Sequence, residues 1–331
     1  MRDTSFDSLI DEYLVYCRSR ELREKTMNSY EQSLRLFERW CMDELNMCSV
    51  DKITESIIRH YITSIQERGK YSFYSNEKQK DTNKPERRRD YRKPVSTTTI
   101  NNYIRNLKAF FNWLDSDCII KKNPMKKVKP LRTERKMKEF LTDEEFKRLI
   151  STLDKSYYPE HRDYAMIMLM IDSGMRLGEC SNLRVEDINL SRKQVTISAD
   201  IAKGRKERSV YFSSKTERVL RHWLQFKDRY VDSEYLFPVK QSESPVRVCG
   251  FETNFKGYVR RAGITKDITP HCLRNNFAKR CLMNGMDIYT LSRILGHSSV
   301  TVTEQAYLDL TEDDIGERYQ HYSPVSTMRN F

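Results

Sequence analysis

Four residues between positions 268 and 310 have side chains that could act on a phosphodiester: His271, Arg274, His297 and Tyr307. A guanidinium presents a rigid fork of donors that fits two phosphate oxygens. A histidine can move protons near neutral pH, and a tyrosine hydroxyl can attack phosphorus and form a covalent ester. Because Pro270 is typical of a first helical residue and residues three apart share a helix face, we expect His271 and Arg274 to point the same way.

The composition indicates a basic protein with a polyanionic partner. The 331 residues carry 59 Lys+Arg against 47 Asp+Glu, a formal net charge of +12, which favours a polyanion, most commonly nucleic acid; a soluble protein that is incidentally basic stays an equal alternative on charge alone. The eight cysteines are scattered without a C-x-x-C pair, which argues against a zinc ribbon or a disulfide framework and for a reducing compartment. No run approaches the ~18 apolar residues of a membrane span, and the N-terminus lacks the apolar core of a signal peptide. We therefore expect a cytoplasmic location and no membrane partner.

The residues with this chemistry fall in the second of the two domains that the length suggests. We expect this domain to span residues 139–310, with a tail at 311–331. Thr142 and Glu145 predict a capping box at its first helix. Residues 194–200 and 207–213 alternate as short strands on either side of Lys203-Gly204-Arg205-Lys206, which predicts a hairpin. Further helices are predicted at 165–171 and near 215–228, 249–262, 270–284 and 287–295.

The first 120 residues predict a separate helical domain. Apolar residues recur at helical spacing in four segments, and the run Ser96-Thr97-Thr98-Thr99 is typical of a helix start. We expect the aromatic residues of these helices to form a core. The fold class predicted for the whole chain is therefore mainly α with a small antiparallel β-sheet, with an N-terminal helical bundle followed by an α+β domain.

Two basic segments are candidates for phosphate contacts. Residues 66–95 show no periodicity and predict a long insertion loop, either solvated or an arm that orders on DNA. Residues 121–138 contain nine Lys/Arg and one acid, with two prolines that stop helices, and predict an interdomain linker along a DNA backbone. The candidate DNA-binding residues are Arg87, Arg88 and Arg89 in the insertion, and Lys121, Lys122, Lys126, Lys127, Lys129 and Arg132 in the linker.

With these features together, the chain resembles the tyrosine recombinases, the family of phage integrases and Xer-type resolving enzymes. Four motifs occur in the family's order: G-M-R-L-G-E at 174–179, A-K-G-R-K-E-R at 202–208, H-C-L-R at 271–274, and L-G-H at 295–297 followed by Tyr307. The likeness covers almost the whole chain and implies a SAM-like core-binding domain before the catalytic domain, with the two domains forming a DNA clamp. Asn275 and Asn276 depart from the residues that many relatives carry after the second arginine, which affects packing and removes no catalytic group.

The resemblance implies which residues hold the scissile phosphate. Arg176 and Arg274 would grip it and neutralise the charge that grows in the transition state, and preorganised donors of this kind are each worth about 10²–10³ in rate. His297 would donate a hydrogen bond to a non-bridging oxygen. Glu179, three residues after Arg176, would have a supporting role.

The resemblance also implies the covalent step. Tyr307 would attack phosphorus to give a 3′-phosphotyrosine and a free 5′-hydroxyl, His271 would assist proton transfer at the tyrosine, and Lys203 would protonate the departing 5′-oxygen. The phosphotyrosine conserves bond energy, so neither ATP nor a metal is expected, and no cofactor is predicted. The implied partner is double-stranded DNA with paired recombination sites, on which four protomers form a tetramer and pass through a Holliday junction.

Each assignment has a structural alternative. A buried arginine paired with Glu179 could serve stability alone, and His271 alone would be an ordinary helix-start histidine. Lys203 could be an exposed turn residue, with Arg205 and Lys206 as competitors for its role. Three later tyrosines compete with Tyr307 for the role of nucleophile: Tyr289, Tyr319 and Tyr322. The position of Tyr307, ten residues after His297, favours it, because the family places the nucleophile nine or ten residues after this histidine.

Two other functions use the same residues in part. A type IB-like topoisomerase shares the active-site chemistry and would relax a supercoiled plasmid that has a single site. A non-cleaving DNA-binding regulator would not need Tyr307.

The tail either docks on a neighbouring protomer or folds back on its own domain. The short stretch before the first helix predicts no separate arm-binding domain, and the target site, the accessory proteins and the choice between integration, excision, inversion and resolution are not encoded in a readable pattern.

Overall fold

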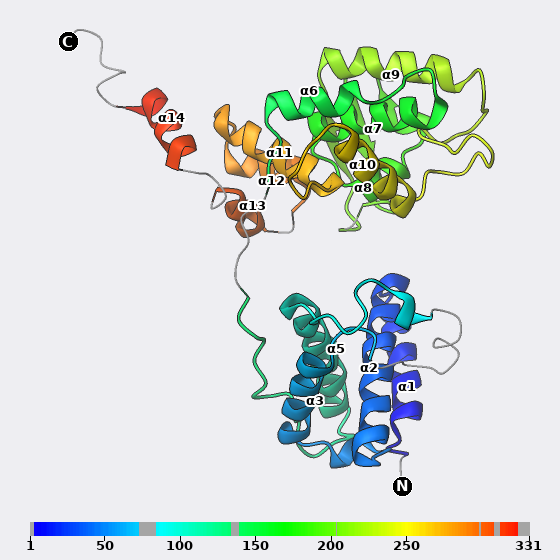
Figure 1. Cartoon of the computed structure of the whole chain (residues 1–331), viewed down its shortest axis with the longest axis vertical. Helices are drawn as coiled ribbons and strands as arrows, with labels where there is room; N and C mark the ends of the chain where they lie inside the picture. Colours follow the sequence, from blue (N-terminus) through cyan, green and yellow to red (C-terminus); the bar gives the residue numbers. More distant parts are fainter. Residues whose placement is uncertain are drawn as a thin grey trace. The chain divides into compact units, whose positions relative to one another are not determined.

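The computed structural model describes residues 3–72, 84–133, 139–202, 204–297, 299–307 and 312–323. The chain divides into two compact units, Met1–Arg135 and Lys136–Phe331, each with its own hydrophobic core. In Figure 1 the first unit runs from blue to green and the second from green to red. Each unit is described by itself.

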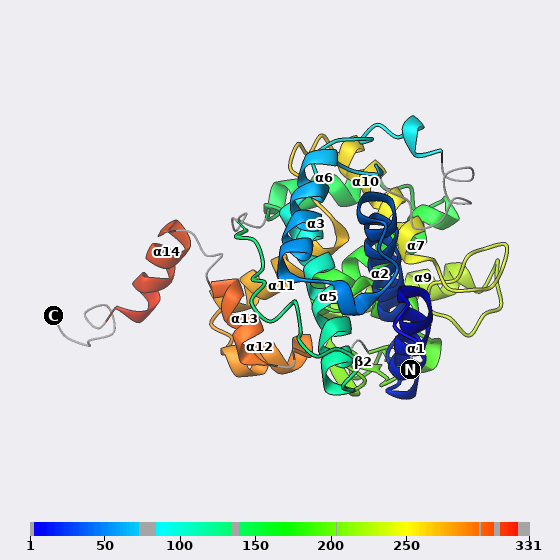
Figure 2. The same cartoon turned by 90° about the horizontal axis from the view of Figure 1, so that it is seen from below.

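In its described residues the first unit is a bundle of four helices, as the sequence predicts. Helix α1 lies against α2, and α2 against α5, in both views of the molecule (Figures 1 and 2). The aromatic residues form the core: Phe37, Trp40 and Phe111 are fully buried. Ser96 caps α5 by accepting a hydrogen bond from the backbone N–H of Thr99. The helices are α1 (Phe6–Ser19), α2 (Glu24–Leu45), α3 (Glu55–Arg68) and α5 (Thr97–Ser116), with short 3₁₀ turns η1 (Val50–Lys52) and η2 (Pro85–Arg87).

The described ends of the insertion are tied together. Helix α3 extends to Arg68, so the loop begins later than residue 66. The backbone N–H of Lys70 donates to the carbonyl of Lys93 at 2.8 Å, and that of Arg92 donates to the carbonyl of Lys70 at 2.9 Å. Gly69 has φ of 75°, and a Cβ there would lie 2.4 Å from the carbonyl oxygen of Arg92, so this close approach requires glycine. Residues 73–83, between these ends, lie outside the described residues.

The segment predicted as a linker begins inside the first unit. Met125 and Val128 are buried in its core. The Asn101 side chain donates to the carbonyl of Leu131 at 2.9 Å and accepts from its N–H at 2.8 Å. The backbone is therefore fixed as far as Leu131. The apolar side chains of this segment therefore point inward and its cations outward. The six basic residues predicted to bind DNA in this segment are all exposed: Lys121, Lys122, Lys126, Lys127, Lys129 and Arg132.

The second unit is mainly helical with a three-stranded antiparallel sheet in the order β1-β2-β3. The fold class predicted from the sequence is confirmed. The predicted hairpin is formed, with strands shorter than expected, and its register pairs Ile197 with Arg208. The third strand, β1, is two residues long and was not predicted. The strands are β1 (Ile188–Asn189), β2 (Gln194–Ile197) and β3 (Arg208–Tyr211).

Helix α7 is the central element of the second unit. Its residues are buried on almost every side, and it packs against both α9 and α11 (Figure 1). It ends at Gly174, where φ is 67° and a Cβ would lie 2.3 Å from the ring of Phe277 on α11. The end of α7 is therefore locked against α11. The helices are α6 (Asp143–Ser151, with the predicted capping box), α7 (Tyr158–Ser173), α8 (Leu177–Ser181), α9 (Ser214–Lys227), α10 (Val248–Arg261), α11 (Pro270–Met283), α12 (Ile288–Leu295), α13 (Val300–Tyr307) and α14 (Glu312–Tyr322), with a 3₁₀ turn η3 (Val185–Asp187).

Helix α14 occupies the described part of the tail. Asp314, in its first turn, forms an ion pair with Lys279 of α11 at 2.6 Å, which joins the start of the tail to its own unit. Ile315 and Tyr319 farther along α14 are exposed. None of the helices in the described ranges combines the length and apolar character needed to cross a bilayer.

Candidate active site

Three arginines converge on the C-terminal end of α12. The last carbonyls of a helix lack partners within the helix and carry partial negative charge, so they attract cations. Helix α12 ends at Gly296, which adopts the left-handed conformation typical of a glycine that ends a helix. Successive carbonyl oxygens accept from the three guanidinium groups: Ile294 from Arg208 at 3.1 Å, Leu295 from Arg274 at 2.7 Å, and Gly296 from Arg176 at 3.4 Å.

Glu179 is the anion that holds two of these arginines together. Its side chain is 2% exposed. One carboxylate oxygen accepts from the backbone N–H of Arg176 at 2.9 Å and from Nη2 of Arg208 at 2.6 Å. The other accepts from Nη1 of Arg176 and from Nη1 of Arg208, both at 3.0 Å. The supporting role expected for Glu179 therefore has a structural basis, and Arg176 sits at the N-cap of α8, with Glu179 in its first turn.

Charge and burial shift the pKa values of this cluster. Burial alone would raise the pKa of Glu179, but the hydrogen bonds from Arg208 and from the backbone N–H of Arg176 outweigh burial and hold the pKa below its usual range. Burial, and then the neighbouring charge of Arg176, lower the pKa of Arg274 to about 9. The arginine charges are thus held close together against their mutual repulsion.

Arg274 also orients His297. Arg274 is 4% exposed, and its Nη1 donates to the carbonyl of Gly174 at 2.7 Å. Its Nη2 lies 2.9 Å from Nε2 of His297, and Nδ1 of His297 lies 2.7 Å from Oγ1 of Thr303. A guanidinium only donates, so Nε2 accepts here and Nδ1 carries the proton toward Thr303. To donate to a phosphate through Nε2, His297 must gain a second proton or change tautomer when DNA arrives.

Of the three remaining predicted residues, His271 and the backbone of Tyr307 are among the described residues. His271 is in the first turn of α11 and is exposed, whereas Arg274 one turn later is buried, so their surroundings differ although the sequence predicted a common direction. Tyr307 is the last residue of α13, which packs against α11 and α12; its side chain lies outside the described residues. Lys203 also lies outside them, between the strands of the hairpin.

The cluster carries an excess of positive charge. Three guanidinium groups face one carboxylate, which leaves a net charge of +2. The uncompensated charge suits a phosphate, whose own charge grows when a nucleophile attacks phosphorus. In the described part of the chain, no group of three or more His, Cys, Asp or Glu residues is arranged to hold a metal ion.

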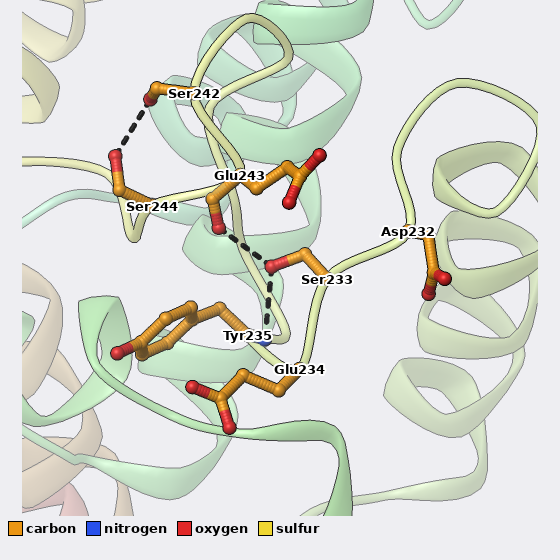
Figure 3. Close-up of a pocket in the computed structure, with 7 residues that line it drawn as sticks. All are labelled: Asp232, Ser233, Glu234, Tyr235, Ser242, Glu243 and Ser244. Carbon is orange, nitrogen blue, oxygen red and sulfur yellow. Dashed lines mark hydrogen bonds between the residues drawn. The ribbon is translucent and has the colours of Figure 1, made fainter.

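A surface hollow in the same unit is unsuited to a phosphate. Its volume is about 400 Å³, and Figure 3 shows acidic and hydroxyl side chains around it. The hydroxyl of Ser233 donates to the carbonyl of Glu243 at 2.7 Å. None of the predicted site residues lines it. The residues that line the hollow are Asp232, Ser233, Glu234, Tyr235, Ser242, Glu243 and Ser244.

Sequence reasoning did not identify Arg208 as a site residue. Its place on β3 held a signal, because residues two apart on a strand share a face and Val210 is buried. A charged side chain on the buried face of a strand needs a buried partner. That partner, Glu179, is 29 residues away, so local pattern alone could not name it. Thr303, which orients His297, was also missed.

Known proteins that resemble this chain belong to one family. The Phage integrase family matches residues 139–313, and the Phage integrase N-terminal SAM-like domain matches residues 10–77. A tyrosine recombinase of Thermosipho africanus is 32% identical over 66% of this chain and 73% of its own length. Tyrosine recombinase XerC of Pediococcus pentosaceus is 24% identical over 97% of this chain and 98% of its own.

Solved structures show the same fold. The XerA recombinase is 25% identical, covers 96% of this chain and 99% of its own, and has a TM-score of 0.51. The Tn1549 transposon integrase, solved in complex with a circular intermediate DNA, is 19% identical, with a TM-score of 0.70 over 96% of this chain and 100% of its own. The chain belongs to the phage integrase family of tyrosine recombinases, which are DNA strand-transferring enzymes.

Glu179→Gln should destabilise the second unit in a pH-dependent way. Removing the charge leaves Arg208 and Arg176 without their counter-ion, and breaking a buried pair costs about 3 kcal/mol at neutral pH. Because the pKa of Glu179 is lowered on folding, its stabilisation is complete above the ordinary carboxyl pKa and is lost as pH falls through the lowered value. The difference between the two proteins should therefore shrink as the pH falls below about 4.

Urea unfolding at neutral and acidic pH, followed by tryptophan fluorescence, measures this difference. The matched control is Glu234→Gln, whose carboxylate pairs with Arg184 at 3.1 Å, with an arginine side chain that is 46% exposed and a glutamate side chain that is 59% exposed. Surface pairs contribute at most about 1 kcal/mol, so this variant should stay close to wild type. Equal losses in both variants would contradict a special role for the buried cluster.

Proposed function

We propose that this chain is a site-specific recombinase that cuts and rejoins double-stranded DNA through a 3′-phosphotyrosine, for a mobile genetic element or for the resolution of replicons. The observation that carries the proposal is the buried arginine cluster with its net positive charge, from which Arg176 and Arg274 would hold the scissile phosphate. XerC relatives over nearly the whole chain, and the shared fold of an integrase solved on DNA, support it.

The reaction needs only groups of the protein and the DNA. The hydroxyl oxygen of Tyr307 bonds to phosphorus while the bond from phosphorus to the 5′-oxygen breaks. His271 takes the tyrosine proton, and Lys203 gives a proton to the departing 5′-oxygen. In the second half, a 5′-hydroxyl of the partner strand attacks the phosphotyrosine and Tyr307 leaves. One ester replaces another in each half, so resealing consumes no ATP.

Arg176 and Arg274 would supply most of the rate. Their charges are already in place before DNA binds, held by Glu179 and by the carbonyls at the end of α12, so little reorganisation is needed at the moment of reaction. A phosphate between them would relieve the repulsion that lowers the pKa of Arg274. His297 is hydrogen-bonded to Arg274, so a phosphate held by Arg274 would lie within reach of the His297 side chain.

Recombination, as opposed to relaxation, implies an assembly of four protomers on two DNA sites. The exposed Ile315 and Tyr319 of α14 offer an apolar surface for a neighbouring copy, while Lys279 holds the start of the helix in its own unit.

A plasmid with two sites should be recombined, and a supercoiled plasmid with one site should remain supercoiled. Relaxation of the single-site plasmid would favour the topoisomerase-like function instead.

Tyr307→Phe should abolish covalent attachment to DNA while leaving binding unchanged, because the substitution removes only the hydroxyl nucleophile. The substrate is a nicked duplex bearing a site selected for binding from a random pool, and the readout is a protein–DNA adduct on a denaturing gel. Tyr289→Phe, at an exposed tyrosine of α12, is the matched control and should form the adduct at the wild-type rate. An adduct that persists in Tyr307→Phe would assign the nucleophile to another tyrosine.

The exposed cations of the segment 121–132 are proposed to lie on the DNA backbone, together with Arg87, Arg88 and Arg89 of the insertion, which are also exposed. Replacing Lys126 and Lys127 by alanine should weaken binding to every sequence alike, because phosphate contacts carry no base information. Each lost contact should reduce the slope of log K against log salt by roughly 0.9.

Fluorescence anisotropy across a salt series measures this slope. The control removes the same charge from the exposed side of α9, through Lys215→Ala with Arg218→Ala. That pair should leave the slope unchanged. An unchanged slope in the Lys126 and Lys127 variant would place the segment away from DNA.

A further inference from the structure

We infer that Arg208 is a positioning residue for the phosphate-binding arginines and acts through Glu179, an inference that rests on the proposed function. Arg208 is the first residue of β3, and its side chain is 11% exposed. It makes three bonds from three nitrogens: Nη1 and Nη2 to the two carboxylate oxygens of Glu179, and Nε to the carbonyl of Ile294. The three bonds span α8, β3 and α12.

Arg208 and Arg176 differ in how their terminal nitrogens are used. Both of its terminal nitrogens face Glu179 as a bidentate pair, at 3.0 and 2.6 Å. Arg176 shares only one terminal nitrogen with Glu179, at 3.0 Å, and its second bond is long, at 3.4 Å. The guanidinium of Arg176 can therefore turn toward a phosphate without leaving Glu179, whereas all three nitrogens of the Arg208 guanidinium are engaged with Glu179 and the carbonyl of Ile294.

Arg208 also supports the turn that carries His297. A Cβ on Gly296 would lie 2.7 Å from Cδ and from Nε of Arg208, so the side chain passes directly over the bare Cα of this glycine. The carbonyl of Gly296 accepts from Arg176, and the next residue is His297. One side chain thus fixes both the carboxylate that orients Arg176 and the turn from which His297 meets Arg274.

A lysine could not replace these contacts. Lysine has one nitrogen on a flexible stem, whereas the guanidinium is planar and matches a carboxylate with two parallel bonds. Without Arg208, the carboxylate of Glu179 would be neutralised by Arg176 alone. The charge of Arg176 would then be directed to Glu179 and away from the phosphate, and the loss of rate should be greatest where negative charge develops on the non-bridging oxygens.

That distinction supplies the test. Adduct formation is measured for wild type, Arg208→Gln and Arg208→Lys on the selected nicked duplex, with either a phosphodiester or a methylphosphonate at the scissile position. The methylphosphonate lacks the non-bridging negative charge and depends less on arginines. On the phosphodiester we expect a loss of about 10²-fold in both variants, the scale of a misplaced catalytic group. On the methylphosphonate the loss relative to wild type should be about tenfold smaller.

Combining Arg208→Gln with Glu179→Gln tests the route. If Arg208 acts through Glu179, the double variant should be about as slow as the slower single variant, because residues that act as a unit are not additive. Losses that multiply would show that Arg208 touches the phosphate itself and would overturn the inference. Arg261→Gln, which breaks the bidentate pair with Glu160 elsewhere in the unit, is the control and should slow neither substrate.

Circular dichroism and thermal melting establish that the variants are folded, and Arg208→Lys, which keeps the charge, serves if Arg208→Gln is not. Equal losses on the two substrates would overturn the inference and leave Arg208 a residue of general stability. In that case wild type still forms its adduct, and the proposed function stands. If wild type forms no adduct on a well-bound duplex, the proposed function fails, and the inference fails with it.

Discussion

A carboxylate can be buried only where cations and N–H groups replace the water that it loses. Glu179 meets this condition through Arg176 and Arg208, which reach it from the start of α8 and from β3. The helix, the strand and the end of α12 are thereby held in one arrangement. The site depends on this interaction, because the other bond that the described residues offer the guanidinium of Arg176, to the carbonyl of Gly296, is long at 3.4 Å.

The same cluster is under electrostatic strain that a substrate would relieve. Arg274 is nearly buried beside Arg176, and both effects lower its pKa. Carbonyl oxygens at the ends of α7 and α12 offset part of this cost, because they are the partially negative ends of helices. A phosphate between the arginines would supply the missing anion. Preorganised charge of this kind lowers a barrier because the cost of assembling it is met when the protein folds.

Local features of the fold could be predicted from the sequence, because caps and apolar spacing act over a few residues. Ser96, Thr142 and Gly296 mark helix ends where expected. The family motifs named the arginines, but the pairing of Arg208 with Glu179 joins residues that are distant in the chain, so periodicity could not show it. The basic residues and prolines of 121–138 predict a linker, and the few apolar residues that anchor its first part, such as Met125, leave too weak a pattern to show that this part is packed.

A structure of the chain bound to its selected duplex, nicked at the scissile position and soaked with vanadate, tests the central claim most directly. Vanadate bridges attacking and leaving oxygens and imitates five-coordinate phosphorus. We expect its oxygens to accept hydrogen bonds from the guanidinium groups of Arg176 and Arg274, while Arg208 keeps both of its bonds to Glu179. Vanadate held elsewhere, or held by Arg208 after it has left Glu179, would contradict the account.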